Sequence, residues 1–432
     1  LNKQTFYVFP NLSPDATEQY FAKLKYARSG NAKLTDDDRD GKTNEDGFDD
    51  LNGDGKITMM RVEDATGEWI TSSDDPRVLI KADITKGQKG KYLLFTEGID
   101  NDKDGKFNED GEGGVAFNKN MSYNYPNFEP GSGEHMVSEK ENRALLDFLF
   151  EAYNVYTVVS FGPFNNLSNP VSFNRAGVSK RIISSWYQED VNTNETISKT
   201  YNKIVKGKNA PKTTGTPGNF AEWAYFHYGR LSLSTPGWWV PQTKPDTAKK
   251  QKAFTENNDE ANYLRWAEQQ KIENTFTNWT SVKHPDFPNQ KVEIGGIDAF
   301  AMINPPYKLV PSLVKEHTQF IATLATMAPE LDLVNLKTEK LEGGLTRITV
   351  DVINKGAIPT QTKVGEKSNW LKNIQVNLTT NGQILSGKAN QTIGAIGGYG
   401  SQTLTWLIKA SGKVTIKVQS PQNGTKSLDI NL

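Results

Sequence analysis

The chain has 432 residues, a formal net charge of −1 and 23% charged residues, so its length suits two or three domains with sizeable cores. A charge balance this close to neutral argues against nucleic acid or a strongly acidic membrane as a partner. The absence of cysteine excludes disulfide and thiolate chemistry, and no apolar run reaches the roughly 18 residues of a membrane span.

The chain opens on a predicted strand, Gln4–Phe9, which is followed by a predicted helix. Ser13 is a favourable N-cap, Pro14 suits the first helical turn, and the helix is expected to run to about Arg28. Because Leu1 is not a natural start and a strand pattern begins at once, we expect a segment upstream, which could include a signal peptide.

An acidic stretch at 36–110 holds three turns, DDDRDGKTNEDG (Asp36–Gly47), DLNGDGKI (Asp50–Ile57) and DNDKDGKFNEDG (Asp100–Gly111). The first and third are identical at nine of twelve positions. Alternate carboxylates fall on one side of such a turn, and the glycine allows it to close around a cation. Many oxygen ligands in a flexible loop favour calcium, so we predict several calcium ions. A solvated acidic loop without metal is the alternative.

The predicted calcium ligands are the oxygen-bearing side chains of the three turns: Asp36, Asp38, Asp40, Asn44, Glu45, Asp46, Asp50, Asn52, Asp54, Asp100, Asp102, Asp104, Asn108, Glu109 and Asp110. None of the turns completes an EF-hand, since the twelfth position holds Gly47, Arg61 or Gly111. Without the bidentate glutamate, the affinity should suit the millimolar calcium found outside cells. We therefore expect an extracytoplasmic protein, periplasmic or exposed at the cell surface.

The remaining pattern up to residue 330 alternates strands and helices, which predicts an α/β domain around a mixed sheet. Ser138 and Glu141 form a predicted capping box for one helix, and the uncharged run Val155–Phe161 predicts a strand buried on both faces. The stretch Lys244–Glu260 is predicted to be a surface insertion. The other expected elements are strands at Ile57–Val62, Lys91–Thr96, Leu231–Ser234 and Lys291–Gly296, and helices at Arg181–Val205, Gly218–Tyr228, Ala261–Gln270 and Pro311–Met327.

After Pro329 the pattern changes to short runs with alternating apolar and polar residues, separated by Gly, Asn and Ser turns. TRITVDVIN, NIQVNLTT, SQTLTWLI and GKVTIKVQS are examples, and no helical pattern remains. This period of two predicts a second domain at 331–432, an immunoglobulin-like β-sandwich of about one hundred residues.

The four histidines do not form a metal motif. None lies in H-x-x-E or H-E-x-x-H spacing, so no zinc site is expected within the chain. His227 is predicted to pack in an aromatic helix face, His317 to lie at the surface, and His284 to bond locally in a loop. An aromatic group (Trp223, Tyr225, Phe226, Tyr228, Trp238 and Trp239) is either the lining of a ligand cleft or a packed core.

The order of these landmarks resembles the zinc metallocarboxypeptidases of the carboxypeptidase A type, in a bacterial branch with calcium-like acidic loops and a C-terminal β-sandwich. The matching segments are FPNLSPDA (Phe9–Ala16), the acidic loops, NKN (Asn118–Asn120), VVSFG (Val158–Gly162), WAYFHYGRLSLST (Trp223–Thr235) and HPDFPNQKVEIGG (His284–Gly296). They extend over nearly the whole chain. The resemblance implies a mixed eight-stranded sheet between helices, here N-terminally incomplete, with the active cleft at strand ends.

The resemblance also implies that the chemistry has been lost. The family's H-x-x-E motif would lie upstream of Gln4–Phe9, and its third zinc histidine would stand where this chain has Gly162. Lys119 replaces the arginine that binds the substrate carboxylate, and no carboxylate follows the strand Leu231–Ser234, where Pro236 stands. A zinc-bound water needs the metal and a proton-shuttling carboxylate, which these residues do not provide.

Three hypotheses follow. The first is a non-catalytic, calcium-binding carboxypeptidase-like protein that serves as a binding or assembly component of the cell envelope, with protein partners or a peptide ligand. The second is an active zinc carboxypeptidase with further ligands upstream of Leu1. The third is a glycan- or peptidoglycan-binding module. For a ligand cleft, the candidate residues are Asn118, Lys119, Asn120, Trp238 and Trp239.

Overall fold

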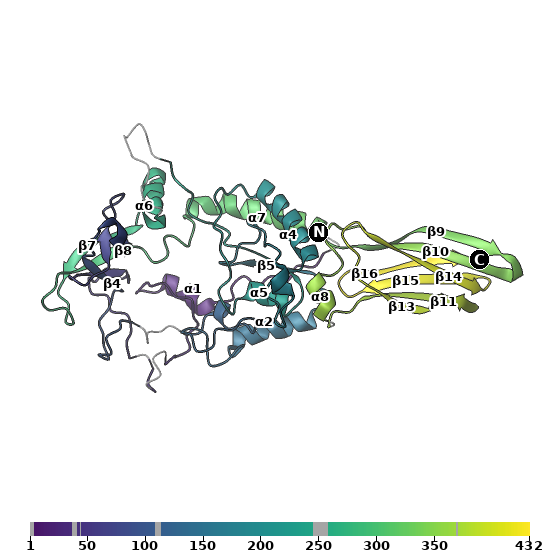
Figure 1. Ribbon diagram of the computed structural model, residues 1–432, viewed down its shortest axis with the longest axis horizontal. Helices are drawn as coiled ribbons and strands as arrows, with labels where there is room; N and C mark the ends of the chain where they lie inside the picture. Colours follow the sequence, from purple (N-terminus) through teal and green to yellow (C-terminus); the bar gives the residue numbers. More distant parts are fainter. Residues whose placement is uncertain (1–3, 37–40, 44, 109–113, 245–257, 369) are drawn as a thin grey trace.

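The computed structural model describes residues 4–36, 41–43, 45–108, 114–244, 258–368 and 370–432. The molecule is elongated, with three regions in a row (Figure 1). We call them the outer region (strands β1–β4, β7 and β8 with helix α6), the central region (strands β5 and β6 with helices α1–α5 and α7) and the sandwich (residues 331–432). Among the described residues, no helix is both long and apolar enough to cross a membrane.

The outer region contains a six-stranded sheet with the order β3-β2-β4-β1-β8-β7, in which all neighbours are antiparallel. Val62 and Ile294 are fully buried in its core. Helix α6 packs beside this sheet through Trp266. The elements are β1 (Met59–Glu63), β2 (Trp69–Thr71), β3 (Leu79–Lys81), β4 (Tyr92–Thr96), α6 (Asp259–Gln270), β7 (Phe276–Val282) and β8 (Val292–Ile297).

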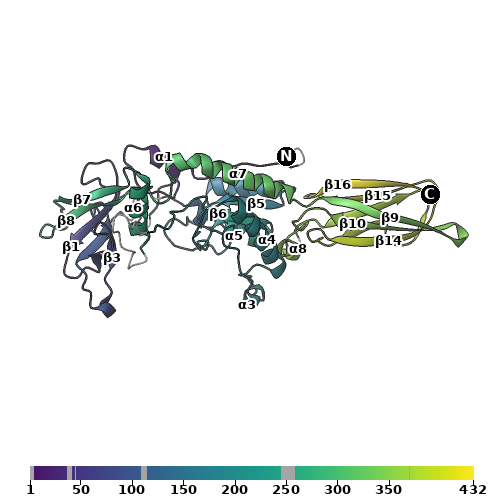
Figure 2. The same cartoon turned by 90° about the horizontal axis from the view of Figure 1, so that it is seen from above.

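The central region is built on two parallel strands, β5 (Thr157–Phe161) and β6 (Leu231–Thr235), with helices around them (Figure 2). Helices α4 and α7 meet through Ile197, Tyr201 and Phe320, which are all buried. The helices are α1 (Pro14–Phe21), α2 (Lys140–Glu151), α3 (Arg175–Val178), α4 (Gln188–Ile204), α5 (Phe220–Phe226) and α7 (Val310–Thr326). Short 3-10 turns cover Ile84–Lys86, Phe117–Lys119, Tyr307–Leu309 and Glu342–Gly344.

The expected eight-stranded mixed sheet does not form among the described residues. β5 and β6 pair only with each other, whereas β1 and β8 join the separate antiparallel sheet. Gln4–Phe9, the predicted strand, has no regular secondary structure and joins no ladder among the described residues, and its apolar side chains are exposed. It packs instead on Phe148 of α2 through Tyr7 and Phe9. The alternating pattern of Gln4–Phe9 therefore does not lead to a β-strand here, because no neighbouring strand among the described residues pairs with it.

Three predicted helix ends are wrong. The helix expected from Arg181 begins only at Gln188. The first helix ends at Phe21 rather than near Arg28, because Ala22 is extended (φ −64°, ψ 160°). The capping box does not form, since α2 starts after Glu139, one residue later than the box requires, and Ser138 Oγ donates to Glu139 Oε1 (2.6 Å) instead.

The sandwich consists of two antiparallel four-stranded sheets, with the orders β12-β14-β10-β9 and β13-β11-β15-β16. Trp406, Val376 and Ile416 are fully buried between them. The predicted β-sandwich and its alternating pattern are confirmed, although helix α8 (Lys363–Ser368) was not expected. The strands are β9 (Leu331–Leu341), β10 (Leu345–Asn354), β11 (Ile374–Thr380), β12 (Gln383–Ser386), β13 (Asn390–Ile393), β14 (Ser401–Lys409), β15 (Lys413–Ser420) and β16 (Gly424–Asn431).

The sandwich and the central region share a core at their junction. Ile358 and Val364 of the sandwich lie in the hydrophobic cluster of α4, α7 and β6. Asp190 of α4 accepts hydrogen bonds from the backbone N–H groups of Lys363 (2.7 Å) and Val364 (3.1 Å). These contacts fix the orientation of helix α8 on the central region.

Candidate functional site

The described parts of the three acidic turns share one hydrogen bond and one glycine conformation. In each turn the first aspartate accepts, through Oδ2, the N–H of the glycine five residues later, which has a left-handed φ that a side chain would strain. The pairs are Asp36 and Gly41 (3.0 Å, φ 96°), Asp50 and Gly55 (2.8 Å, φ 80°), and Asp100 and Gly105 (3.1 Å, φ 92°). The described residues therefore show the same Asp-to-Gly closing hydrogen bond in each of the three stretches.

The third turn brings three carboxylates together. One oxygen from each of Asp100, Asp102 and Asp104 lies within 4.8 Å of the others. Asp100 is 8% exposed, and its buried Oδ1 has no hydrogen-bond partner among the described residues. Asp104 Oδ2 contacts Lys106 Nζ at 2.6 Å. A buried, unpartnered carboxylate oxygen is costly unless a cation or donor reaches it.

The first turn shows the same signature within its described part. Asp36 Oδ1 and Glu45 Oε2 are both buried without a hydrogen-bond partner. Lys42 Nζ contacts Glu45 Oε1 at 2.9 Å. The remaining predicted ligands of the first and third turns, Asp38, Asp40, Asn44, Glu109 and Asp110, lie outside the described residues.

The second turn is more self-contained. Asp50 Oδ1 accepts the N–H groups of Gly53 (2.7 Å) and Asp54 (3.1 Å), in addition to the Oδ2 contact with Gly55. Asn52 Oδ1 also accepts from the Asp54 N–H (2.9 Å). Because backbone donors already occupy both oxygens of Asp50, this turn is less prepared for a cation than the third.

Asp46, which the sequence predicts to be a ligand, lies in a link between the first and third turns. It is fully buried and accepts from the Asn101 N–H (3.0 Å), from Asn101 Nδ2 (3.2 Å) and from the Asn108 N–H. Asn108 itself has a left-handed φ of 60°, and its Oδ1 is buried without a partner. The Asp46 side chain thus joins the first turn to the backbone of the third turn.

Three residues outside the predicted ligand set hold the turns in place. Glu97, fully buried, accepts from the N–H groups of Leu51 (2.9 Å) and Thr58 (3.0 Å), and its burial raises the pKa of its carboxyl group. Asp286 accepts from the Asp100 N–H (3.1 Å), and His284 bonds the carbonyl of Gly98 (2.8 Å). No sequence motif marks these contacts, because they come from residues distant in the chain.

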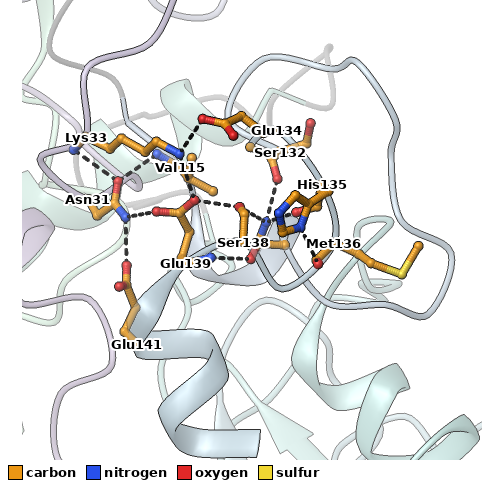
Figure 3. Close-up of polar contacts among 12 residues, drawn as sticks. Asn31, Lys33, Val115, Ser132, Glu134, His135, Met136, Ser138, Glu139 and Glu141 are labelled. Carbon is orange, nitrogen blue, oxygen red and sulfur yellow. Dashed lines mark hydrogen bonds and ion pairs between the residues drawn. The ribbon is translucent and has the colours of Figure 1, made fainter.

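The acidic stretch leaves and rejoins the central region at one point (Figure 3). The Asn31 N–H donates to the Val115 carbonyl (3.0 Å), and the Val115 N–H donates to Asn31 Oδ1 (2.9 Å). Asn31 Nδ2 also donates to Glu139 and Glu141 at the start of α2, at 2.8 Å each. Residues 32–114 are therefore an excursion closed at its base by Asn31.

The predicted cleft residues Asn118, Lys119 and Asn120 are largely engaged in structural contacts. Asn120 is fully buried, and its Nδ2 donates to the carbonyls of Ser132 (2.8 Å) and His135 (3.0 Å). Lys119 Nζ donates to a backbone carbonyl at Pro130 (2.9 Å). Asn118 Oδ1 caps the start of α5 by accepting the N–H of Phe220 (3.1 Å).

The C-terminal ends of the parallel strands β5 and β6 lie together. The Gly162 N–H donates to the Thr235 carbonyl (2.9 Å), which places Gly162 beside Pro236. A Cβ on Gly162 would meet only Asn118 Nδ2, at 4.0 Å. No carboxylate from 235–237 and no imidazole at 162 is available at this end.

His317 lies at the same end, and its predicted place at the surface is wrong. It is 8% exposed, its Nε2 bonds the Gly237 carbonyl (2.8 Å), and its ring packs edge-on against Phe161 (5.3 Å). The spacing of apolar residues along α7 did not predict that the polar residue His317 lies on the helix face toward the end of β6. His284 is buried and bonds in its loop as expected. His227 is exposed rather than packed in the helix face as predicted; Ser122 bonds its Nδ1 (2.9 Å), and the Tyr123 ring lies edge-on to it (5.5 Å).

The aromatic group is mostly a packed core. Trp223, Tyr225 and Tyr228 are fully buried or nearly so. Trp238 is 8% exposed and packs on Trp266 of α6. Its hydrophobic cluster is separate from the cluster that contains Phe117 and Phe220, the neighbours of Asn118. Trp239 is half-buried and donates from Nε1 to the Lys208 carbonyl (2.9 Å).

Comparison with known proteins gives low similarity. The CARDB domain of a Pyrococcus furiosus protein shares 17% identity, with 24% of this chain and 94% of that domain covered and a TM-score of 0.17. The β-glucosidase DesR of Streptomyces venezuelae shares 12% identity over 24% of this chain and 15% of that enzyme (TM-score 0.14). β-Glucosidase 3B of Thermotoga neapolitana shares 10% over 71% and 57% (TM-score 0.14).

These scores are too low to support an assignment of function. No curated protein matches the chain significantly. Residues 330–431, which form the sandwich, match a family model described as a domain of unknown function (DUF8731).

Proposed function

We propose that this protein is a calcium-stabilised, extracytoplasmic carboxypeptidase-like protein that acts by binding or assembly in the cell envelope rather than by catalysis. The observation that carries the proposal is the third acidic turn. There, oxygens of Asp100, Asp102 and Asp104 lie within 4.8 Å of one another, and Asp100 Oδ1 is buried without a donor. A hard cation with oxygen ligands would offset both the mutual repulsion and the buried charge.

The described donor set fits calcium. Asp100, Asp102 and Asp104 offer carboxylate oxygens at alternate positions, and Asn108 offers an unpartnered amide oxygen in the same turn. Nitrogen and sulfur ligands, which zinc prefers, are not part of this cluster. When bound, calcium would supply positive charge that holds the turn closed. Because Asp46 of the first turn accepts the Asn101 N–H of the third turn, calcium in the third turn would also stabilise the first.

The place of action follows from the expected affinity. Since Gly47, Arg61 and Gly111 stand where an EF-hand has its bidentate glutamate, the turns should load at the millimolar calcium found outside cells. The partners we propose are envelope proteins or a peptide. The outer region and the sandwich lie at opposite ends of the elongated molecule (Figure 1).

The test is limited proteolysis with and without chelator. We expect EDTA to open cleavage sites within 36–110 and to lower the melting temperature, and calcium, but not equimolar magnesium, to reverse both. The sandwich strands should stay resistant and serve as an internal control. If EDTA changes neither cleavage nor melting, calcium does not stabilise this region and the proposal fails.

For the end of β5 and β6 we propose a degenerate active centre. Gly162 stands where the resemblance implies a zinc histidine, and Pro236 lies in the segment 235–237, where it implies the catalytic glutamate. His317, at the same end, bonds the Gly237 carbonyl. Lys119 carries a charge that could attract a peptide carboxylate, but a lysine lacks the bidentate fork of arginine.

This second proposal is tested on the longest natural form of the protein. Metal analysis should find no stoichiometric zinc, and substrates with free C-terminal residues should not be hydrolysed. Stoichiometric zinc, with turnover that a zinc chelator abolishes, would favour the active enzyme with upstream ligands. A saturable signal from glycan fragments that a Trp239→Ala variant loses would favour the glycan-binding module.

A further inference from the structure

We propose that Arg230 forms a binding site for a small carboxylate anion at the junction between the central region and the sandwich. Arg230 directly precedes β6 and is 2% exposed. Its Nε and Nη2 are buried and have no acceptor among the described residues. These two nitrogens form one edge of the guanidinium, the edge that pairs bidentately with the two oxygens of a carboxylate.

A third donor without an acceptor belongs to Trp370, whose ring the guanidinium packs on. Trp370 Nε1 is buried and also lacks a partner among the described residues. The Arg230 guanidinium lies 5.1 Å from the Trp370 ring and 4.9 Å from the Tyr228 ring. The indole nitrogen is close to Gly229, the residue before Arg230, at 3.6 Å from an ideal Cβ there. Among the described residues, three donors here lack an acceptor, whereas one acceptor, Gln361 Oε1, lacks a donor, and this surplus of donors favours an anion.

The protein supplies no counter-charge for Arg230 in the part of the chain that the structure describes, where no carboxylate reaches ion-pair distance of its guanidinium. Asp190 borders the same cavity, but its oxygens already accept from Lys363, Val364 and Tyr225. Burial lowers the pKa of Arg230, as expected for a desolvated cation. An anion bound to the Nε and Nη2 edge would offset the free-energy cost of burying the charged guanidinium.

A cavity of about 20 Å³ adjoins Arg230, and a group of a few atoms, the size of formate, fits such a space. Its walls come from both regions, with Tyr156 and Arg230 on one side and Pro359, Gln361 and Leu371 on the other. Gln361 Oε1 lacks a donor and would accept from a water beside the anion. Because Thr362 Oγ1 also donates to the Gly229 carbonyl (2.7 Å), an anion here would strengthen an existing junction.

The test uses the intact chain and sodium formate, with chloride as the second arm and a bulky sulfonate to hold ionic strength constant. In a proton–nitrogen NMR spectrum, the Trp370 indole signal, assigned by its loss in Trp370→Phe, should shift saturably with formate. The melting temperature should rise over the same range. Arg230→Met should lose both responses, and Arg347→Met, at an exposed sandwich position, should retain them.

Each outcome decides the proposal. A formate response that Arg230→Met abolishes supports it. A response to chloride alone would overturn the carboxylate assignment, and no Trp370 shift with either anion would show that water fills the cavity. Should Arg230→Met fail to fold, the wild-type Trp370 titration still decides between these results. The test does not involve calcium, so its failure leaves the proposed function unaffected.

Discussion

Asn31 and Val115, 84 residues apart, exchange two hydrogen bonds that close the base of the acidic excursion (Figure 3). The approach is close enough that a Cβ on Gly114 would lie 1.8 Å from the Asn31 carbonyl oxygen. Asn31 also carries the link to α2 through Glu139 and Glu141. The stability of the proposed calcium region is therefore coupled to the central region through one asparagine.

Asn31→Ala should destabilise the fold by about 1–3 kcal/mol, because it leaves the Val115 N–H and two carboxylates without their partner. Chemical denaturation measures the change, and amide exchange should increase at Val115. The control is Asn381→Ala, at an exposed turn of the sandwich, for which less than about 0.5 kcal/mol is expected. Equal effects at both positions would show that the closure contributes little.

Asp100→Asn should remove calcium-dependent stabilisation while keeping the acceptor for the Gly105 N–H. A ligand at a hundredfold excess over its Kd stabilises by about 2.7 kcal/mol, and the variant should lose most of that shift. Melting curves with calcium and with EDTA measure it. Asp429→Asn, at an exposed sandwich site, is the matched control and should keep the calcium response. An unchanged response in Asp100→Asn would exclude this carboxylate as a ligand.

Gly162→Ala and Gly237→Ala should differ in sign. Gly162 has ordinary backbone geometry and open space, so alanine should be neutral or stabilise by about 0.4–1 kcal/mol through the unfolded chain. Gly237 has a φ of 76°, and a Cβ there would lie 3.0 Å from Phe161, so its substitution should destabilise by more than about 1 kcal/mol. Denaturation midpoints compare them. A large loss in Gly162→Ala would show that this position carries a structural role.

Asp190→Asn should destabilise the junction in a pH-dependent way. Burial raises the pKa of Asp190, so the folded state holds its proton more tightly than the unfolded chain. Wild-type stability from this group is therefore full below the ordinary aspartate pKa and falls as pH rises through the raised value. The loss in Asp190→Asn should be largest at low pH and shrink as pH rises. Glu195→Gln, on an exposed turn of α4, should show no such trend.

The measurement is the free energy of unfolding of the wild-type protein and both variants across this pH range. Tyr225, Lys363 and Glu189 also act on the carboxyl group, and the two variants leave them in place. A difference between wild type and Asp190→Asn that grows with pH would mean that Asp190 is ionised at little cost in the folded state.

Local patterns in the sequence predicted the features whose geometry is local. The alternation in 331–432 predicted the sandwich, because a sheet with one buried face needs a period of two. The spacing from Asp100 to Gly105 predicted a closed turn, because an aspartate can reach the N–H five residues on when glycine allows a left-handed φ. The local pattern of Leu231–Ser234 likewise predicted strand β6, which ends one residue later, at Thr235.

Tertiary contacts decided the rest. The sequence could not show that Asp46 would bind the third turn, that His317 would face Gly237, or that Gln4–Phe9 would find no strand to pair with among the described residues. Each depends on which distant segment lies alongside, and the free energy of such a contact comes from burial and pairing that no local pattern contains. The unpartnered donors of Arg230 and Trp370 likewise became visible only when two regions of the chain met around them.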